Sequence, residues 1–476
     1  MKCGMKMINS LKQFSPEEIN ELMILSTGVD YQLFEREGIG FDYEALMSSS
    51  GYTLQDVMKI QTDFNVGKTP LLELRNMTEY ARKFAKENYG ARIFLKDEAQ
   101  NLSGSFKARR AAMSIYEAKR RGFKGVIAAT SGNYGAAVAA MAARSGLKCI
   151  IIQEAFDSKM KAQPEILEKA RACEAYGAEV IQVSVGPELF LVLLNLLELT
   201  GYFNATLYSP YGIMGIETIG SEIATETKAL TGKFPDVVLV THAGGGNLTG
   251  TARGLRKSGA THTQIIGASV NLTGLHMASD TDFNLKSFTT GHTGFGIPFA
   301  TNPDRSDVPR SAARPLRYMD EYYLASQGSV FFITEALAIL EGLERGPAGN
   351  TALAVAFKLA QSRPKDEIIV VQESEYTGAG KHHQSQLSFA KKNGVELLLS
   401  NTTTEEPGKN IVLPESAKAL DIIQKDVKEL RKSYLKKYHQ NVLTNEDILY
   451  LAEELNTSSA DIKTLLSEVT YETKKR

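Results

Sequence analysis

Four short segments of the chain combine small residues with side chains that could bind a ligand or carry chemistry. In the first, residues 101–109 (NLSGSFKAR), Lys107 follows a run of small residues and precedes a stretch of helical composition. A lysine at a helix start meets the positive end of the helix dipole, which lowers the pKa of its ammonium group. Such a lysine can form a Schiff base, although a lone lysine is more often a solvated residue on an amphipathic helix.

Two later segments place glycines directly after apolar runs. Residues 130–135 (TSGNYG) follow the run 126–129, and residues 241–248 (THAGGGNL) follow the run 237–240. Backbone N–H groups at a helix start attract anions, and glycines let the backbone approach a phosphate closely. The first loop alone is equally well explained as an ordinary helix cap. The second lacks the signatures of a P-loop and of a dinucleotide site, so it indicates a phosphate site of another kind.

A fourth segment, residues 373–380 (ESEYTGAG), offers hydroxyls and carboxylates beside glycines, and alone it is equally a turn between a strand and a helix. The sequence gives little support to a metal site or to a nucleophilic cysteine or serine. The chain has no His-Glu-x-x-His, Cys-x-x-Cys or Gly-x-Ser-x-Gly, and its seven histidines are scattered apart from His382 and His383, so we expect no metal site. Cys149 lies in an apolar run and Cys173 in a helical stretch, and neither has an activating neighbour.

These segments need elements to position them, and from about residue 66 onward short apolar runs alternate with helical stretches. Runs rich in valine and isoleucine, without polar alternation, are typical of parallel strands buried on both faces. The pattern predicts an α/β fold with parallel sheets, whose ligands bind at the carboxyl ends of strands. The expected strands are 126–129, 148–152, 179–183, 237–240, 264–270 and 367–371, and two of the expected helices are 135–145 and 161–176.

Both ends of the chain differ from this centre. Ser15 followed by Pro16 has the features of a helix start within a lead-in of about 64 residues. Residues 401–414 are polar and contain Pro-Gly, which indicates a linker. Thr444 and Ser458 begin two capping-box-like helix starts, each followed by an apolar face. Acidic residues outnumber basic ones there, so a docking helical tail is preferred over a DNA-binding helix pair.

Composition disfavours several classes of protein. The chain has 476 residues, 54 Lys plus Arg, 55 Asp plus Glu and a formal net charge of -1, which speaks against a nucleic-acid-binding protein and against intrinsic disorder. The longest apolar run, 189–199, is too short to span a membrane, and the N-terminus shows no secretory signal. Cys3, Cys149 and Cys173 are too few for a disulfide framework, so we expect a cytoplasmic protein.

The order of the four segments is more informative than any one of them. Together with residues 68–71 (KTPL), and with Lys96-x-Glu98 ahead of residues 105–109 (SFKAR), they resemble the tryptophan synthase beta/threonine synthase group of fold type II pyridoxal 5′-phosphate (PLP) enzymes. The resemblance covers most of the chain. It implies two interleaved parallel-sheet domains with helical N- and C-terminal extensions. The implied boundaries are 65–120 with 215–400 for a larger PLP-binding domain, 121–214 for a smaller one, and 1–64 and 401–476 for the extensions.

The same resemblance implies roles for individual residues. One lysine forms the Schiff base with PLP and handles the proton at Cα, one loop binds the substrate carboxylate, and a glycine loop holds the phosphate. In that order the residues are Lys107; Thr130, Ser131 and Gly132; and Gly244, Gly245, Gly246 and Asn247. Asn133 is expected to hydrogen-bond the phenolic oxygen of PLP. Thr377 is the expected partner of the pyridine nitrogen, with Glu373 or Glu375 as the alternative.

Within this group the chain resembles the beta-subunit family of 2-amino-4-oxopentanoate thiolases. The lead-in up to residue 71, residues 373–381 (ESEYTGAGK) and the helical C-terminus carry this likeness. It implies cleavage of 2-amino-4-oxopentanoate with coenzyme A to alanine and acetyl-CoA, in ornithine degradation. It also implies a small alpha subunit as partner, with a dimer of this chain inside a hetero-oligomer.

Two alternatives share the same four segments. One is a PLP-dependent ammonia-lyase acting on diaminopropionate, serine or threonine, and the other is a threonine-synthase-like enzyme. Dependence on coenzyme A separates the thiolase from both, because a lyase releases ammonia without it. A non-catalytic metabolite-binding subunit is disfavoured, since Lys107 occurs with the full set of loops.

Overall fold

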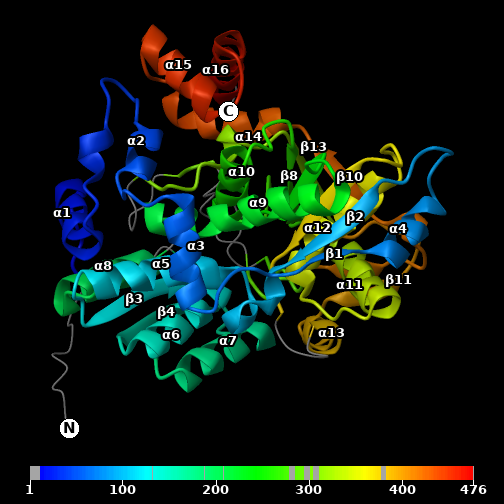
Figure 1. Ribbon diagram of the computed structural model, residues 1–476, viewed down its shortest axis with the longest axis horizontal. Helices are drawn as coiled ribbons and strands as arrows, with labels where there is room; N and C mark the ends of the chain where they lie inside the picture. The colour runs from blue at the N-terminus through cyan, green and yellow to red at the C-terminus, as the bar shows by residue number, and fades with distance from the viewer. Residues whose placement is uncertain are drawn as a thin grey trace.

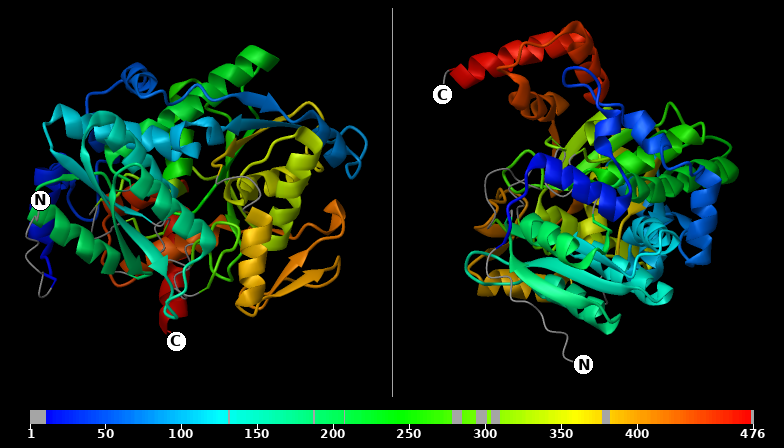
Figure 2. Two further views of the ribbon diagram at one scale, coloured as in Figure 1. Left: turned by 90° about the horizontal axis from the view of Figure 1, so that it is seen from below. Right: turned by 90° about the vertical axis from the view of Figure 1, so that its left-hand side faces the viewer.

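Two mainly parallel β-sheets form the centre of the molecule, and helices pack on their faces, as the computed structural model shows (Figures 1 and 2). The described residues are 11–130, 132–186, 188–206, 208–277, 285–293, 301–303, 310–376 and 382–474. The parallel strands and the helices packed on them confirm the predicted α/β fold with parallel sheets. Within the described residues, no helix has the length and the apolar character that crossing a membrane would require.

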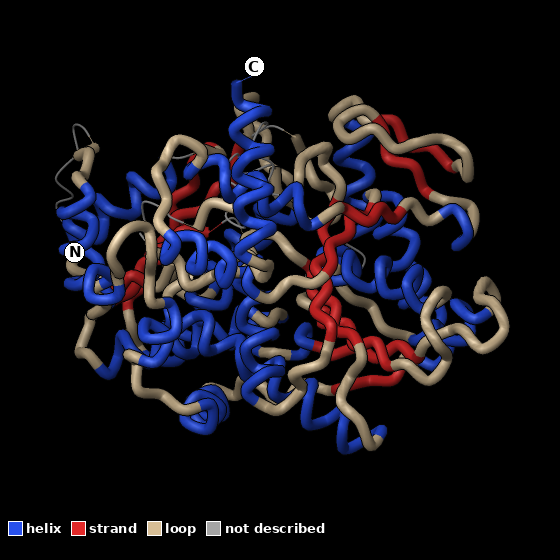
Figure 3. The backbone as a smooth tube through the Cα atoms, turned by 90° about the horizontal axis from the view of Figure 1, so that it is seen from above, coloured by secondary structure: helices blue, strands red, loops and turns tan. Residues whose placement is uncertain are grey.

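The larger sheet has seven strands in the order β1-β2-β10-β7-β8-β9-β13. Its centre is parallel, and the two edge strands β1 and β13 run antiparallel to their neighbours. In Figure 3 these strands form a twisted ribbon through one half of the molecule. Their bounds are Leu71–Glu73 (β1), Arg92–Asp97 (β2), Val237–Thr241 (β7), Gln264–Val270 (β8), Glu321–Ala325 (β9), Ile368–Glu373 (β10) and Ile422–Lys425 (β13).

Successive residues of a central strand enter two different hydrophobic cores. In β7, Val238 and Val240 belong to the core beneath α9 and α10, whereas Val237 and Leu239 belong to the core beneath α11 and α12. Both faces are therefore buried, which explains why the run 237–240 lacks polar alternation. The helices concerned are α9 (Pro210–Thr231), α10 (Gly246–Lys257), α11 (Gln327–Glu341) and α12 (Pro347–Ala360).

The smaller sheet has four parallel strands in the order β5-β4-β3-β6. All four lie inside residues 121–214, although the domain boundaries themselves stay a prediction. The strands are β3 (Gly125–Thr130), β4 (Lys148–Phe156), β5 (Glu179–Ser184) and β6 (Phe203–Asn204). The helices around this sheet are α5 (Lys107–Arg120), α6 (Asn133–Ser145), α7 (Pro164–Ala175) and α8 (Glu188–Thr200).

Most of the predicted elements are present with small shifts at their ends. The predicted strand 264–270 has the bounds of β8, while β10 begins one residue later than predicted and extends to Glu373. Helix α6 begins two residues before the predicted start and ends at Gly146, whose φ of 69° is left-handed. This is the glycine stop expected from the sequence. The apolar run 189–199 is the predicted buried helix, since α8 buries Leu193, Leu194 and Leu197.

The N-terminal lead-in is helical, as predicted. Helix α1 (Pro16–Thr27) starts with a complete capping box, in which the Ser15 hydroxyl accepts from the Glu18 backbone and the Glu18 carboxylate accepts from the Ser15 backbone. Short helices α2 (Tyr43–Ser48) and α3 (Leu54–Asp63) follow, and α3 packs against α5 and α9. The lead-in therefore packs on α5, whose first turn lines the cavity described below.

The C-terminal segment is only partly helical, which corrects the interpretation of residues 401–414 as a linker. Strand β12 (Asn410–Leu413) lies in this segment and pairs in parallel with β11 (Glu396–Leu399). Its residues Ile411 and Val412 are buried. Strand β13 then joins the larger sheet. The predicted helices begin only afterwards, as α14 (Val427–Leu435), α15 (Asn445–Glu454) and α16 (Ser459–Lys474), which project from one end of the molecule (Figure 1).

Candidate active site

A cavity of about 150 Å³ gathers the described residues that the sequence predicted for the site. Its walls come from the start of α5, the β3–α6 loop, the β7–α10 loop and the end of β10. The predicted residues that line it are Lys107, Thr130, Gly132, Asn133, Gly244, Gly245, Gly246 and Asn247. Ser131 and Thr377 lie outside the described residues. The four segments, far apart in the sequence, thus meet in one place.

Lys107 is the first residue of α5 and lies in the cavity wall. Burial of its ammonium group lowers the pKa of Lys107 well below its usual value. The nearby Arg110 guanidinium and Lys169 lower this pKa further, whereas Glu375 opposes the shift. The direction agrees with the prediction made from the helix start, but the main cause is loss of contact with water. A lysine with this environment is suited to act as a nucleophile and as a base.

The glycine loop after β7 leads directly into α10. Gly245 precedes the first residue of the helix and has a left-handed φ of 91°. A Cβ atom on Gly244 would lie 1.7 Å from the Tyr208 hydroxyl, and one on Gly246 would lie 2.5 Å from the Tyr208 ring. These positions therefore require glycine, and the backbone at the start of α10 lines the cavity. The Asn247 side chain is buried beside them, and neither of its polar atoms has a hydrogen-bond partner among the described residues.

The loop between β3 and α6 is closed by its own threonine. The Thr130 hydroxyl accepts hydrogen bonds from the backbone N–H of Gly132 at 2.9 Å and of Gly135 at 3.2 Å. This hydroxyl is thereby engaged in shaping the first turn of α6. The backbone of Gly132 and the side chain of Asn133 still line the cavity. A Cβ atom on Gly132 would come within 2.9 Å of Lys169 and 3.0 Å of His292, so the loop lies against both side chains.

The end of β10 contributes Ser374 and Glu375 to the cavity, whereas Glu373 is not among the lining residues. Oε1 of Glu375 is buried without a hydrogen-bond partner among the described residues. Burial raises the pKa of Glu375 to about 7, with Lys169 and Lys107 opposing this shift and Glu165 adding to it. A substantial fraction of Glu375 is therefore still protonated at neutral pH, and this acid form can donate a proton.

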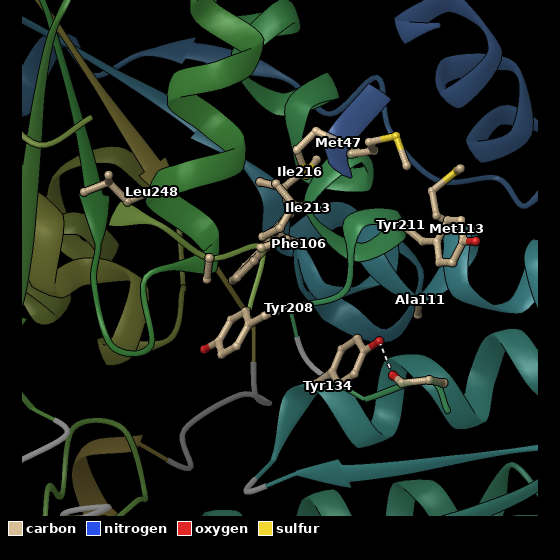
Figure 4. Close-up of a cluster of buried hydrophobic side chains, with 14 of the residues drawn as sticks. Met47, Phe106, Ala111, Met113, Tyr134, Tyr208, Tyr211, Ile213, Ile216 and Leu248 are labelled. Atoms are coloured by element: carbon tan, nitrogen blue, oxygen red, sulfur yellow. Dashed lines mark hydrogen bonds between the residues drawn. The ribbon is translucent and has the colours of Figure 1, made fainter. Parts of the chain in front are cut away.

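The structure adds residues that sequence reasoning did not single out. Arg110 lines the cavity with its guanidinium carbon 4.6 Å from the ring centre of Tyr134 and 5.0 Å from that of Tyr208. Figure 4 shows the two tyrosines, with the Tyr134 hydroxyl donating to the carbonyl of Ala205. Arg110 follows Lys107 by three residues, and residues with this spacing lie on the same side of a helix, so the sequence did contain a signal for it. His292 belongs to no motif, and burial together with Lys169 and Lys107 holds its pKa well below the usual value.

Arg109, two residues after Lys107, points into a different environment. Its Nε atom lies 2.7 Å from Oε2 of Glu98, and its Nη1 atom lies 2.7 Å from Oε1 of Glu222. Lys96 Nζ adds an ion pair to Glu222 at 2.8 Å. Burial works against the charged form of Glu222, but Arg109 and Lys96 lower the pKa of Glu222 to about 2. The motif of Lys96, Glu98 and Arg109 therefore forms a buried ion network that anchors α5.

The cavity residues fit PLP. Backbone amides at the start of α10 suit a phosphate, the unpartnered amide of Asn247 lies beside them, and Lys107 is available to bind an aldehyde. Among the described residues, no group of three or more histidine, cysteine, aspartate or glutamate side chains has the arrangement of a metal site.

Comparisons with known proteins agree with this site. The sequence profile of the family described as pyridoxal-phosphate dependent enzyme matches residues 62–374. A 2-amino-4-ketopentanoate thiolase beta subunit of Acetoanaerobium sticklandii is 60% identical over 94% of this chain and 97% of its own length. A second protein of that name, from an unknown prokaryotic organism, is 56% identical over 94% of this chain and 96% of its own length.

Solved structures share the fold at low sequence identity. A PLP-dependent aspartate racemase has a TM-score of 0.54 at 18% identity, covering 68% of this chain and 95% of its own. The serine racemase of Dictyostelium discoideum has a TM-score of 0.52 at 18% identity, covering 68% of this chain and 97% of its own. The fold, the cavity and the match over residues 62–374 lead to one conclusion: the chain belongs to the family of pyridoxal-phosphate-dependent enzymes, with PLP as its cofactor.

Proposed function

We propose that this chain is the beta subunit of a thiolase that cleaves 2-amino-4-oxopentanoate with coenzyme A to alanine and acetyl-CoA. The observation that carries the proposal is the 60% identity, over nearly the full length of both chains, to a protein named as such a subunit. The cavity supports it, because Lys107 and the described residues of all four segments line one space. The proposal includes a small alpha subunit as partner, a dimer of this chain in the complex, and a place in ornithine degradation.

The residues have separate tasks in this proposal. Bound PLP supplies an electron sink for charge that develops on the substrate. Lys107 binds the cofactor and then takes and returns the proton at Cα of the substrate. The start of α10, with Gly244, Gly245, Gly246 and Asn247, holds the phosphate. The backbone of the β3–α6 loop holds the substrate carboxylate, and Asn133 orients the ring through its phenolic oxygen.

Cleavage of the C3–C4 bond also needs a proton near the C4 carbonyl oxygen as the thiol adds. Glu375 is suited to hold that proton, since its pKa of about 7 lets it both keep and release a proton near neutral pH, and its Oε1 atom has no protein partner among the described residues. Thr377 remains the proposed partner of the pyridine nitrogen. Ser374 is a further candidate for that contact because it lines the cavity at the end of β10.

An enzyme thiol that accepts the acetyl group is not offered by the described part of this chain. Cys149 and Cys173 are both buried and unpaired, and neither lines the cavity. Burial raises the pKa of each thiol to about 12, which suppresses the reactive thiolate. We therefore propose that coenzyme A attacks the substrate directly or that the alpha subunit contributes a thiol. Unpaired cysteines are also what a cytoplasmic location would give.

The test is to purify this chain with and without its proposed partner and to supply PLP, 2-amino-4-oxopentanoate and coenzyme A. We expect alanine and acetyl-CoA in equal amounts, with the full rate only in the complex. Omission of coenzyme A should stop the reaction. Release of ammonia from diaminopropionate, serine or threonine without coenzyme A would instead identify a lyase, and the thiolase proposal would fail.

A further inference from the structure

The amino-acid cavity leaves no room for most of a coenzyme A molecule. Its volume of about 150 Å³ is smaller than the roughly 300–1,000 Å³ that encloses a drug-sized ligand. Coenzyme A carries its thiol at the end of a flexible arm, with phosphates and an adenine ring at the other end. If its thiol reacts in the cavity, the phosphates must lie outside, at a place that joins the cavity by a passage.

Two further cavities are linked to the active site by residues that line more than one of them. Glu154 and His292 line both the active-site cavity and a narrow one of about 10 Å³. Lys161 lines this narrow cavity and also a third one, of about 180 Å³. Each neighbouring pair therefore shares wall residues. Gln163 and Thr293 also line this small cavity, where the Gln163 amide donates to the backbone carbonyl of His292 at 3.0 Å.

The third cavity is basic although the whole chain is nearly neutral. Lys159, Lys161 and Lys286 line it together with one carboxylate, Asp157. That carboxylate is already engaged, since it pairs with Lys286 and accepts the backbone N–H of Lys159 at 2.9 Å and of Lys161 at 2.8 Å. Neither Lys159 nor Lys161 has an ion-pair partner among the described residues, and both are exposed. Their positive charges are therefore not neutralised within the described residues and can attract an anion, although the Lys161 ammonium also donates to the neutral side chain of Asn393.

The rest of the third cavity is suited to a nucleotide. Leu285 and Val395 contribute apolar surface, on which an aromatic base can rest. The Lys161 ammonium donates to the Asn393 side chain at 2.8 Å, which draws the turn after β4 toward the end of α13 (His382–Lys392). Helix α13 also contacts α7, and Figure 1 shows the two beside each other. The last turn of α13 contains Lys391 and Lys392, directly before Asn393, which lines this cavity.

We propose that the cavity lined by Lys159, Lys161 and Lys286 binds the phosphates of coenzyme A, and that its thiol arm reaches the active site past Lys161 and His292. This inference rests on the proposed thiolase function. The Lys159 and Lys161 side chains hold the anionic groups by charge-assisted hydrogen bonds. The small cavity has room for about one water molecule, so its walls must move apart for the thiol arm to pass. The nucleotide stays outside, and the thiol is delivered beside the β3–α6 loop.

The test compares coenzyme A with pantetheine, which has the same thiol arm but no phosphates, in the PLP-loaded complex with the partner subunit. In Lys159→Ala/Lys161→Ala we expect the KM for coenzyme A to rise roughly tenfold or more. The KM for pantetheine, the KM for 2-amino-4-oxopentanoate and the visible absorbance of the bound cofactor should not change. Added salt should raise the wild-type KM for coenzyme A and leave that for pantetheine unchanged. Lys86→Ala, at an exposed lysine after α4 (Arg75–Arg82), is the matched control.

Two results would overturn the site. One is an unchanged KM for coenzyme A in the double variant, which would place the phosphates on the partner subunit or on another face. The other is an equal loss with pantetheine, which would show damage to the passage rather than loss of phosphate binding. A calorimetric titration of the same complexes with coenzyme A is independent of turnover. If the wild-type complex makes no acetyl-CoA, the thiolase function fails, while binding that depends on Lys159 and Lys161 would still support the site.

Discussion

Two clusters of buried charge lie on helix α5, and they differ in how their charges are balanced. Around Arg109 every charge has a partner, with Glu98 and Glu222 on its guanidinium at 2.7 Å and Lys96 on Glu222 at 2.8 Å. Around Lys107, no ion pair joins its ammonium to a carboxylate among the described residues, and Oε1 of Glu375 is without a partner there. Only one residue, Ala108, separates Lys107 from Arg109 in the chain.

The difference separates structural charge from chemical charge. The Arg109 cluster is closed on itself, and its attraction offsets the cost of removing the charges from water. In the Lys107 cluster the buried charges are not paired in this way. Burial therefore lowers the pKa of Lys107 and raises the pKa of Glu375. Groups left in this state are available to a ligand, which is why strongly shifted pKa values mark candidate active sites.

The largest effect should come from Lys107→Ala, which removes the group that binds the cofactor. We expect activity to fall about a thousandfold or more and the visible absorbance of the lysine-bound cofactor to disappear. The free energy of unfolding of the apo-protein should remain close to wild type, because no ion pair is lost. Absorbance spectra and thermal unfolding provide the two measurements. A variant that kept the absorbance band would contradict the assignment of Lys107.

The next effect should come from Arg109→Met, which leaves Glu98 and Glu222 buried without their main partner. We expect a loss of about 3–5 kcal/mol in the free energy of unfolding. Denaturant unfolding of the apo-protein measures this loss, with Lys107→Ala as the matched variant on the same helix. Equal stability of the two variants would remove the distinction between the clusters.

The smallest effect on stability, with the opposite sign, should come from Glu375→Gln. The folded carboxyl holds its proton up to about pH 7, whereas its ordinary pKa is 4.5, so the folded state binds more protons between these values. Wild-type stability from this group is therefore full below about pH 4.5 and is lost as the pH rises through 7. The free energy of unfolding of the variant, compared with that of the wild type at the same pH, should therefore be more favourable at pH 8 than at pH 5.

The same substitution tests the catalytic use of the carboxyl. Glutamine cannot donate the acidic proton, so we expect kcat to fall about a hundredfold at neutral pH. Unfolding at pH 5 and pH 8, together with steady-state rates, checks both parts. Wild-type kcat in the variant would contradict the catalytic use of the carboxyl, and an unchanged pH profile of stability would contradict its raised pKa.

The sequence predicted those site residues whose position follows from a neighbouring strand or helix in the sequence. Lys107, Asn133 and the glycine loop each follow or begin an element, and their place at a strand end or helix start fixes where they point. His292 and Lys169 were missed because they reach the cavity from a loop and from α7 through tertiary packing, which leaves no local pattern. Strands β12 and β13 were missed because each has four residues, too few for a periodic signal.

The strand order of the larger sheet has a consequence for synthesis on the ribosome. Strand β10 (Ile368–Glu373) lies between β2 (Arg92–Asp97) and β7 (Val237–Thr241), so the centre of the sheet stays open until residue 373 has been made. Until then the nascent chain exposes two unpaired strand edges, which are prone to wrong pairing. The cofactor cavity also needs Ser374 and Glu375. Capture of PLP is therefore a late event, and a bound cofactor reports that the sheet has closed.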